Sequence, residues 1–289
     1  MKVGTKTDAP APRAARLRQT PVSLRSSQIR TVVLLFCGYA ACYYCRADLS
    51  VATPLLAGEL AVHGVSHAEA LVHIGTITSL GVAAYALGKL FLTGLGDYWG
   101  GRRNFLIGVG GAAVFTLLFA LSGGLPLFTL AWSANRLTQS VGWAGLIKVS
   151  SKWFNYSSYG SIAGILSISY LVGDAAARQQ MAMLLARGYG WRALFLFAAA
   201  VAAAALLANF LWLRESRVEE GHAEAEPNPA LNLFTSGEAR PAGVAALLLP
   251  LLRSRAFLLV CLLSFGCTIV RETLNTWSPA YLRDYVGYS

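Results

Sequence analysis

TVVLLFCGYAACYYCR at residues 31–46 and AFLLVCLLSFGCTIVR at residues 256–271 are two apolar stretches that each end in an arginine. In both, fifteen residues without charge precede that arginine. A charged side chain near the middle of a membrane helix costs about 2.5–3.5 kcal/mol. Each arginine is followed by a leucine at the third position and a proline at the eighth: Arg46 by Leu49 and Pro54, and Arg271 by Leu274 and Pro279. The shared register indicates a duplicated unit in which the charged residue has a function.

The composition is that of a membrane protein. Of 289 residues, 55% are hydrophobic and 13% are charged, and the mean hydropathy is +0.52. Soluble domains carry about 25% charged residues. Because a spanning helix needs about 20 apolar residues, and a chain in lipid must satisfy its backbone groups within each segment, we predict an all-α polytopic membrane protein. Seven spans are predicted, at 31–57, 70–94, 104–122, 125–149, 160–186, 191–213 and 256–282.

The net charge of +10 reports orientation rather than a nucleic-acid partner. Residues 1–30 hold seven basic residues against a single acid, Asp8. The loops after the second, fourth and sixth predicted spans are also basic, whereas the first loop on the opposite side, 58–69, carries no arginine or lysine. This asymmetry predicts a cytoplasmic N-terminus and lipid, not nucleic acid, as the surroundings.

Cysteine and histidine, which often form metal or redox sites, are present, but not in the combinations that such sites need. The five cysteines all fall inside predicted spans, so Cys42-x-x-Cys45 is interpreted as buried free thiols. The histidines near the first outer loop lack cysteine or carboxylate partners on a shared face. We therefore predict no metal site, no disulfide framework and no cofactor.

The domain plan follows from the spans and the repeat. We predict a basic cytoplasmic tail (1–30), a six-helix bundle (31–213), a cytoplasmic linker (214–255) and the first helix of a second, incomplete bundle (256–289). On this interpretation the sequence is a fragment or a truncated product of a two-half protein that is a monomer at full length. A seven-span receptor matches the count, but receptors of that type place the N-terminus outside.

The segment TGLGDYWGGRR at 93–103 joins the second and third predicted spans. It resembles the loop signature of the major facilitator superfamily, in which carboxylate and guanidinium groups hold one face of a half closed. It departs from that signature at Thr93, Tyr98 and Gly101, and the alternative is an ordinary turn with basic residues. The matching positions are Asp97, Gly100, Arg102 and Arg103.

The arginine segments narrow the resemblance to the organophosphate:phosphate antiporters, which include glycerol-3-phosphate and hexose-6-phosphate transporters. GYAACYYCR at 38–46 resembles the first helix of that family, and Arg271 with WSPAYL at 277–282 resembles the seventh. AYALGK at 84–89 resembles the second, and the similarity covers the chain after residue 30. The resemblance implies a major facilitator fold in which Arg46 and Arg271 bind the substrate phosphate.

Binding of a phosphate by two arginines is chemically reasonable without the resemblance. A phosphate monoester carries about −1.5 to −2 charges at pH 7, and ionised guanidinium groups meet its oxygens bidentately. The alternative is that each arginine pairs with a nearby acid, Asp48 or Glu272. Neither acid is a natural partner on the same helix, because Asp48 lies about 200° and Glu272 about 100° around the helix.

Further cleft residues follow from the same resemblance. Lys89 is a supporting charge or a lysine that reaches the interface, and Tyr39 and Tyr43 share the Arg46 face as ligands or as packing. Tyr170 stands where bacterial glycerol-phosphate carriers have a histidine, so the substrate's identity does not transfer. Asp174 and Arg178 are predicted to pair at i,i+4, and Arg136 has no assignment. The remaining candidate is Trp143, a cavity wall.

These features favour a bacterial inner-membrane antiporter that exchanges a phosphorylated metabolite for inorganic phosphate by alternating access. Its partners are then an organic phosphate, inorganic phosphate and the lipid bilayer, and no catalytic residue is expected. A sugar-phosphate sensor on the same fold and a carrier for a non-phosphorylated organic anion remain alternatives. An intramembrane enzyme is not indicated, since the sequence contains no HExxH, GxSxG or paired membrane aspartates.

Overall fold

The computed structural model describes residues 23–62, 64–93, 96–226 and 252–287, with the side chains of 96 and 97 left out. Within these ranges the chain is helical and contains no strand. Much of the predicted tail and of the predicted linker lies outside the described residues. The elements are α1 (Leu24–Val62), α2 (His67–Phe91), α3 (Gly96–Trp99), α4 (Gly101–Leu121), α5 (Leu125–Gln139), α6 (Gly142–Trp153), α7 (Tyr156–Ala186), α8 (Trp191–Trp212), the 3₁₀ helix η2 (Arg217–Glu220) and α10 (Arg255–Asp284).

Six of the described helices are long and apolar enough to cross a membrane, namely α1, α2, α4, α7, α8 and α10. The predicted fourth span, 125–149, instead forms two shorter helices, α5 and α6, which are interrupted at Ser140 and Val141. Both residues keep right-handed helical backbone angles, and the Ser140 N–H bonds the Leu137 carbonyl, a tighter turn than in an α-helix. The interruption falls at a point where the sequence carries polar residues and glycine.

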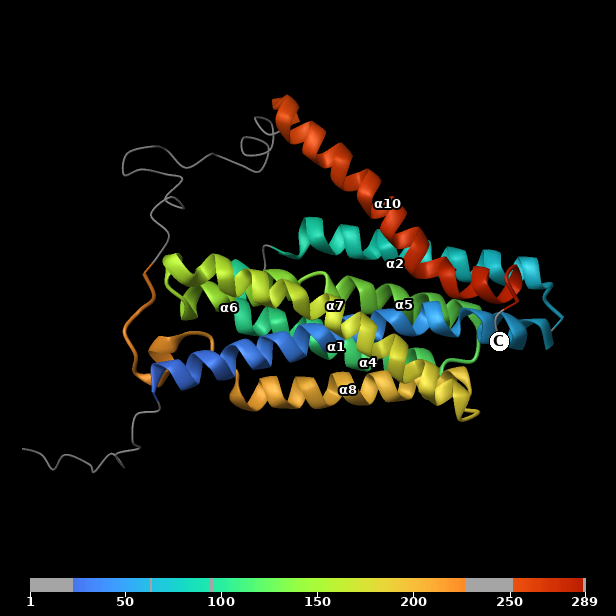
Figure 1. Ribbon diagram of the computed structural model, residues 1–289, viewed down its shortest axis with the longest axis horizontal. Helices are drawn as coiled ribbons and strands as arrows, with labels where there is room; N and C mark the ends of the chain where they lie inside the picture. Colours follow the sequence, from blue (N-terminus) through green and yellow to red (C-terminus); the bar gives the residue numbers. More distant parts are fainter. Residues whose placement is uncertain (1–22, 63, 94–95, 227–251, 288–289) are drawn as a thin grey trace, which may run out of the picture.

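The bundle is arranged around α1, which packs against α7 and α8 and also meets α2, α4, α6 and α10. On the far side α4 packs against α8 and α5, and α2 packs against α5. Figure 1 shows α10 crossing this bundle obliquely, with its amino-terminal part standing away from the other helices. Accordingly, Ala280 near its carboxyl end is the buried residue of α10. The predicted all-α fold, a six-span bundle with the first helix of a second one, is confirmed.

Small residues let the helices approach closely. A Cβ atom on Gly173 of α7 would lie 2.3 Å from the Ala40 carbonyl oxygen of α1. A Cβ atom on Gly145 of α6 would lie 2.5 Å from the Phe105 backbone nitrogen of α4. Backbone therefore meets backbone at both contacts, as in membrane bundles with small residues at their helix interfaces.

The first part of the predicted linker, residues 214–226, lies on the bundle rather than extending from it. Arg217 is buried, and Arg30 of α1 forms an ion pair with Glu220. The Trp153 indole donates to the Arg214 carbonyl at 3.2 Å. Polar groups at 214–220 make these contacts. Their composition alone does not distinguish them from polar residues that are exposed to solvent.

Candidate functional site

A cavity of about 240 Å³ lies between α1, α2, α5, α7 and α10. Both arginines of the repeated register line it, so the structure brings Arg46 and Arg271 to one site. The other residues of its wall are Tyr43, Leu49, Ser50, Thr78, Trp132, Arg136, Tyr170, Leu171, Asp174, Arg178, Glu272, Asn275 and Thr276.

Arg46 is held rigidly. Its Nε donates to the Gln139 Oε1 at 2.7 Å, and its guanidinium carbon lies 4.3 Å from the ring centre of Tyr43 and 4.7 Å from that of Tyr85. Stacking on aromatic rings stabilises a guanidinium group and fixes its plane. The Nη2 atom has no hydrogen-bond partner among the described residues. Arg46 therefore keeps one buried donor whose hydrogen bond is not satisfied by the described residues.

Arg271 is placed differently. Its Nη2 lies 3.2 Å from the Glu272 Oε1, and its side chain is 55% exposed. The prediction that Glu272 is not a natural partner is therefore wrong: two flexible side chains that follow each other in sequence reach one another in the open part of the cavity. Such an exposed pair contributes roughly 0–1 kcal/mol, so an incoming anion competes with it readily.

Asp48, the acid considered for Arg46, forms no ion pair with it among the described contacts. Its Oδ1 accepts the N–H of Leu49 at 2.7 Å, and the side chain is fully buried. Arg46 is thus not neutralised by its own helix.

Two further arginines line the cavity. Arg136 of α5 is 9% exposed, with its Nε unpartnered among the described atoms, and Arg178 of α7 pairs with Asp174 as predicted, Nε to Oδ2 at 2.9 Å. The signal for Arg136 was available in the sequence, because it too is a charge inside a predicted span. The cavity wall then carries four arginines against Asp174 and Glu272, a net charge of +2.

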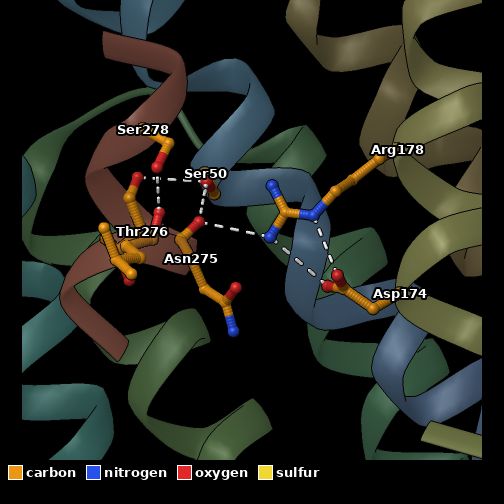
Figure 2. A network of polar contacts seen from close by, with 7 residues as sticks. Ser50, Asp174, Arg178, Asn275, Thr276 and Ser278 are labelled. Carbon is orange, nitrogen blue, oxygen red and sulfur yellow. Dashed lines mark hydrogen bonds and ion pairs between the residues drawn. The ribbon is translucent and has the colours of Figure 1, made fainter. Parts of the chain in front are cut away.

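The contact between α1 and α10 forms one edge of this cavity, and Figure 2 shows its polar network. The Ser50 hydroxyl donates to the carbonyls of Asn275 (2.6 Å) and Thr276 (3.0 Å). Arg178 Nη2 donates to the same Asn275 carbonyl at 3.2 Å. Because Pro279 has no N–H, the Asn275 carbonyl four residues earlier has no helical donor and is free for these bonds.

Ser50 and Asn275 hold the same position in the repeat. Each lies four residues after its arginine and four before its proline. Residues related by a two-fold axis meet where that axis passes through a contact. The Ser50–Asn275 bond is what two repeats related in this way produce, so the register seen in the sequence agrees with the packing.

The predicted aromatic residues form a row that ends in the cavity. Ring centres are 5.2 Å apart for Trp143 and Tyr39, 5.3 Å for Tyr39 and Tyr43, and 5.3 Å for Tyr43 and Tyr170. Tyr43 and Tyr170 line the cavity, whereas Tyr39 and Trp143 pack behind them. Lys89 is not in the cavity wall: it is exposed in the last turn of α2, with its Nζ 5.3 Å from the centre of the Tyr85 ring on which Arg46 also stacks.

The loop motif lies at the opposite end of α2 from the His67–Asp284 contact of α2 with α10. Gly100 has a φ of 88°, which favours glycine, and it precedes α4. Arg102 donates through its Nε to the Leu213 carbonyl at 2.6 Å, so it ties α4 to the end of α8. Arg103 lines a second, basic cavity of about 600 Å³ there, and the side chain of Asp97 lies outside the described residues.

Glu215 organises this end of the bundle. It accepts hydrogen bonds from the backbone N–H groups of Gly101 (2.9 Å) and Arg102 (2.6 Å), and from Lys152 Nζ (2.5 Å). Burial acts to raise the pKa of Glu215, but the bonds from Lys152, Arg102 and Gly101 outweigh it and hold that pKa below its ordinary value. A carboxylate thus caps the start of α4.

A family model described as Major Facilitator Superfamily matches residues 33–289. The chain belongs to this superfamily. A solved structure of a bacterial homologue of the human lysosomal transporter Spinster, in an inward-facing and unoccupied conformation, superposes with a TM-score of 0.67. It is 15% identical and covers 91% of this chain and 57% of its own, which shows the shared fold.

Curated relatives of the chain carry transporter names. A probable hexose phosphate transport protein of Chlamydia trachomatis is 23% identical over 91% of this chain and 58% of its own length. A glycerol-3-phosphate transporter of Bacillus subtilis is 21% identical over 97% and 63%. Human sugar phosphate exchanger 3 is 30% identical over 55% and 34%.

The resemblance to organophosphate:phosphate antiporters is confirmed by these relatives, which are transporters rather than enzymes. The chain spans about three fifths of the length of the first two.

Proposed function

We propose that the chain exchanges a phosphorylated metabolite for inorganic phosphate, and that its six-helix bundle and α10 together hold the substrate. The observation that carries the proposal is the shared cavity of Arg46 and Arg271, with a wall of net charge +2. A phosphate monoester brings up to about two negative charges. The named substrates of the relatives, hexose phosphate, glycerol 3-phosphate and sugar phosphate, belong to this class.

Arg46 and Arg271 have different roles in this proposal. Arg46 is already oriented by Gln139 and two tyrosines, so it offers a fixed edge to the phosphoryl oxygens. Arg271 exchanges Glu272 for the same anion from the other side. An anion held by both helices couples binding to movement of α10 against α1. Alternating access requires a coupling of this kind.

Location and orientation belong to the same proposal. The basic cavity at the α3–α6 end and the ion pairs of residues 214–220 are the features of a cytoplasmic face under the distribution rule for positive charge. Tyr98 and Trp99 of α3 are exposed beside this cavity, and aromatic side chains of this kind are enriched at membrane interfaces. We place the chain in a bacterial inner membrane with this end inside.

The test is counterflow in liposomes that contain the purified chain and are loaded with inorganic phosphate. Uptake of labelled glycerol 3-phosphate is expected with the native sequence, and a loss of at least tenfold with Arg46→Ala or Arg271→Ala. Arg255→Gln, an exposed arginine at the start of α10, is the matched control.

The same samples separate the alternatives. Binding of glycerol 3-phosphate without counterflow favours a sensor, and an organic anion whose binding inorganic phosphate does not displace favours a carrier of another class. Normal exchange by both arginine variants contradicts the proposed site.

A further inference from the structure

The second cavity, of about 600 Å³ at the α3–α6 end of the bundle, has no part in the proposed exchange. None of its described wall residues belongs to the cavity of Arg46 and Arg271. Two acids accompany the basic residues of its wall, so the described wall carries a net charge of +3. The basic residues are Arg102, Arg103, Lys148, Lys152 and Arg214.

The two acids of this wall do not cancel its positive charge. Glu215 is already engaged, because its carboxylate accepts from Lys152 Nζ at 2.5 Å and from two backbone N–H groups of α4. Glu219 is exposed to water. Arg103 and Arg214 are exposed as well and form no ion pair among the described residues. An anion that enters the cavity therefore meets positive charge that the fold leaves uncompensated.

The folded structure places these charges together. Basic residues that only orient a membrane protein can lie anywhere in its cytoplasmic loops. Here they come from the start of α4, from α6 and from the segment after α8, and Glu215 joins these three parts through its bonds to Arg102 and Lys152. Arg102 Nε also donates to the Leu213 carbonyl at 2.6 Å. The convergence of charge is thus built by long-range contacts and is more than orientation requires.

An apolar surface begins where this cavity ends. Tyr98 and Trp99 of its wall are 86% and 48% exposed, and Phe210 and Trp212 at the end of α8 are 60% and 55% exposed. The Arg102 guanidinium carbon lies 5.8 Å from the Phe210 ring centre, so the basic wall adjoins this end of α8. α8 is long and apolar enough to cross a membrane, and Figure 1 shows it at the edge of the bundle. A small soluble anion uses the cavity alone, whereas an amphiphile with an anionic head uses both surfaces.

We propose that the second cavity binds the phosphate headgroup of an anionic phospholipid, whose acyl chains lie along the exposed end of α8. Basic pockets between membrane helices bind such headgroups through the charge of their lysine and arginine residues. The bound lipid holds the start of α4, the end of α6 and the segment after α8 together. This inference goes beyond the proposed exchange and does not depend on it.

The test uses nanodiscs that contain phosphatidylglycerol and phosphatidylcholine in equal amounts and with the same acyl chains. Native mass spectrometry of the released chain measures the ratio of the two lipids that it retains. The native chain is expected to be enriched in phosphatidylglycerol. Because each basic residue contributes about fivefold, Arg103→Gln combined with Arg214→Gln is expected to lower the enrichment by about 20-fold.

The matched control is Arg253→Gln combined with Arg255→Gln, which removes two exposed charges at the start of α10. It is expected to keep the native enrichment. The exposed positions of all four arginines allow folding, and equal melting temperatures in phosphatidylcholine discs check it. Native enrichment in the Arg103/Arg214 variant, or an equal loss in the control, overturns the lipid site.

A second arm separates a lipid from a soluble phosphate. It uses Arg46→Ala, so that the first cavity does not contribute, and adds millimolar inorganic phosphate or glycerol 3-phosphate. The retained phosphatidylglycerol is expected to stay unchanged, and its displacement overturns the lipid assignment in favour of a soluble anion. Arg46→Ala is itself expected to retain phosphatidylglycerol as the native chain does, so a failure of the proposed exchange leaves this result readable.

Discussion

The arginine segments of α1 and α10 share a register but lie in different surroundings. α1 is enclosed by six other helices, and Arg46 is fixed by Gln139 and two aromatic rings. α10 is exposed along most of its length, and among the described contacts Arg271 pairs with Glu272. The repeat sets where a charge lies along a helix, whereas the neighbouring helices decide whether that charge is preorganised. We expect the two arginines to contribute unequally to binding.

The largest expected effect is that of Arg46→Ala. Removing a buried group that meets a charged partner costs roughly 2–5 kcal/mol, so phosphate affinity is expected to fall by about 100-fold or more. Titration of the purified chain with glycerol 3-phosphate in nanodiscs measures it. A loss smaller than that of Arg271→Ala would reverse the comparison.

Lysine substitutions sharpen the contrast. Arg46→Lys keeps the charge but loses the planar group that stacks on Tyr43 and Tyr85, so we expect a loss of about tenfold. Arg271→Lys, at a site without stacking, is expected to lose about threefold or less. The same titration measures both, and equal losses would show that the stacking of Arg46 does not matter to binding.

The contact between the two segments is the third test. Ser50→Ala removes the donor to the Asn275 carbonyl and is expected to weaken the α1–α10 contact by about 1 kcal/mol. Hydrogen–deuterium exchange of the amides of α10 near residue 280 is expected to become faster. Ser278→Ala, whose hydroxyl bonds Leu274 within α10, is the control and is expected to leave that contact in place.

The smallest expected effect lies away from the cavity, at Glu215. Its pKa is lowered in the folded chain, so its stabilisation is complete above the unfolded pKa of about 4.3 and is lost as the pH falls through the lower folded value. Glu215→Gln is expected to lower the melting temperature slightly at pH 7, with a free-energy change of about 1 kcal/mol or less. Thermal melts between pH 3 and 7, roughly the range that spans these pKa values, should therefore converge for the two proteins at the acid end. Unchanged ligand affinity of Glu215→Gln at pH 7 would show that Glu215 does not influence binding at Arg46 and Arg271.

The sequence predicted the spans, the repeat and the two arginines because each depends on local composition and spacing. Their meeting in one cavity rests on the packing of α10 against α1, which the register anticipated only as a hypothesis. Arg136 and Arg178 were recognisable as charges inside spans, but their shared wall is set by α5 and α7 approaching from distant parts of the chain. The pairing of Arg271 with Glu272 and the helix interruption at Ser140 depend on side-chain reach and helix packing, which spacing does not encode.

The approach of Gly173 to the Ala40 carbonyl has a mechanical consequence. At 2.3 Å from where a Cβ would stand, α1 and α7 have no side-chain layer between them that could compress or slide. In the proposed transport cycle we therefore expect movement at the contact between α10 and α1, and little sliding between α1 and α7. Gly173→Ala is expected to force those two backbones apart and to loosen the contact between α1 and α7.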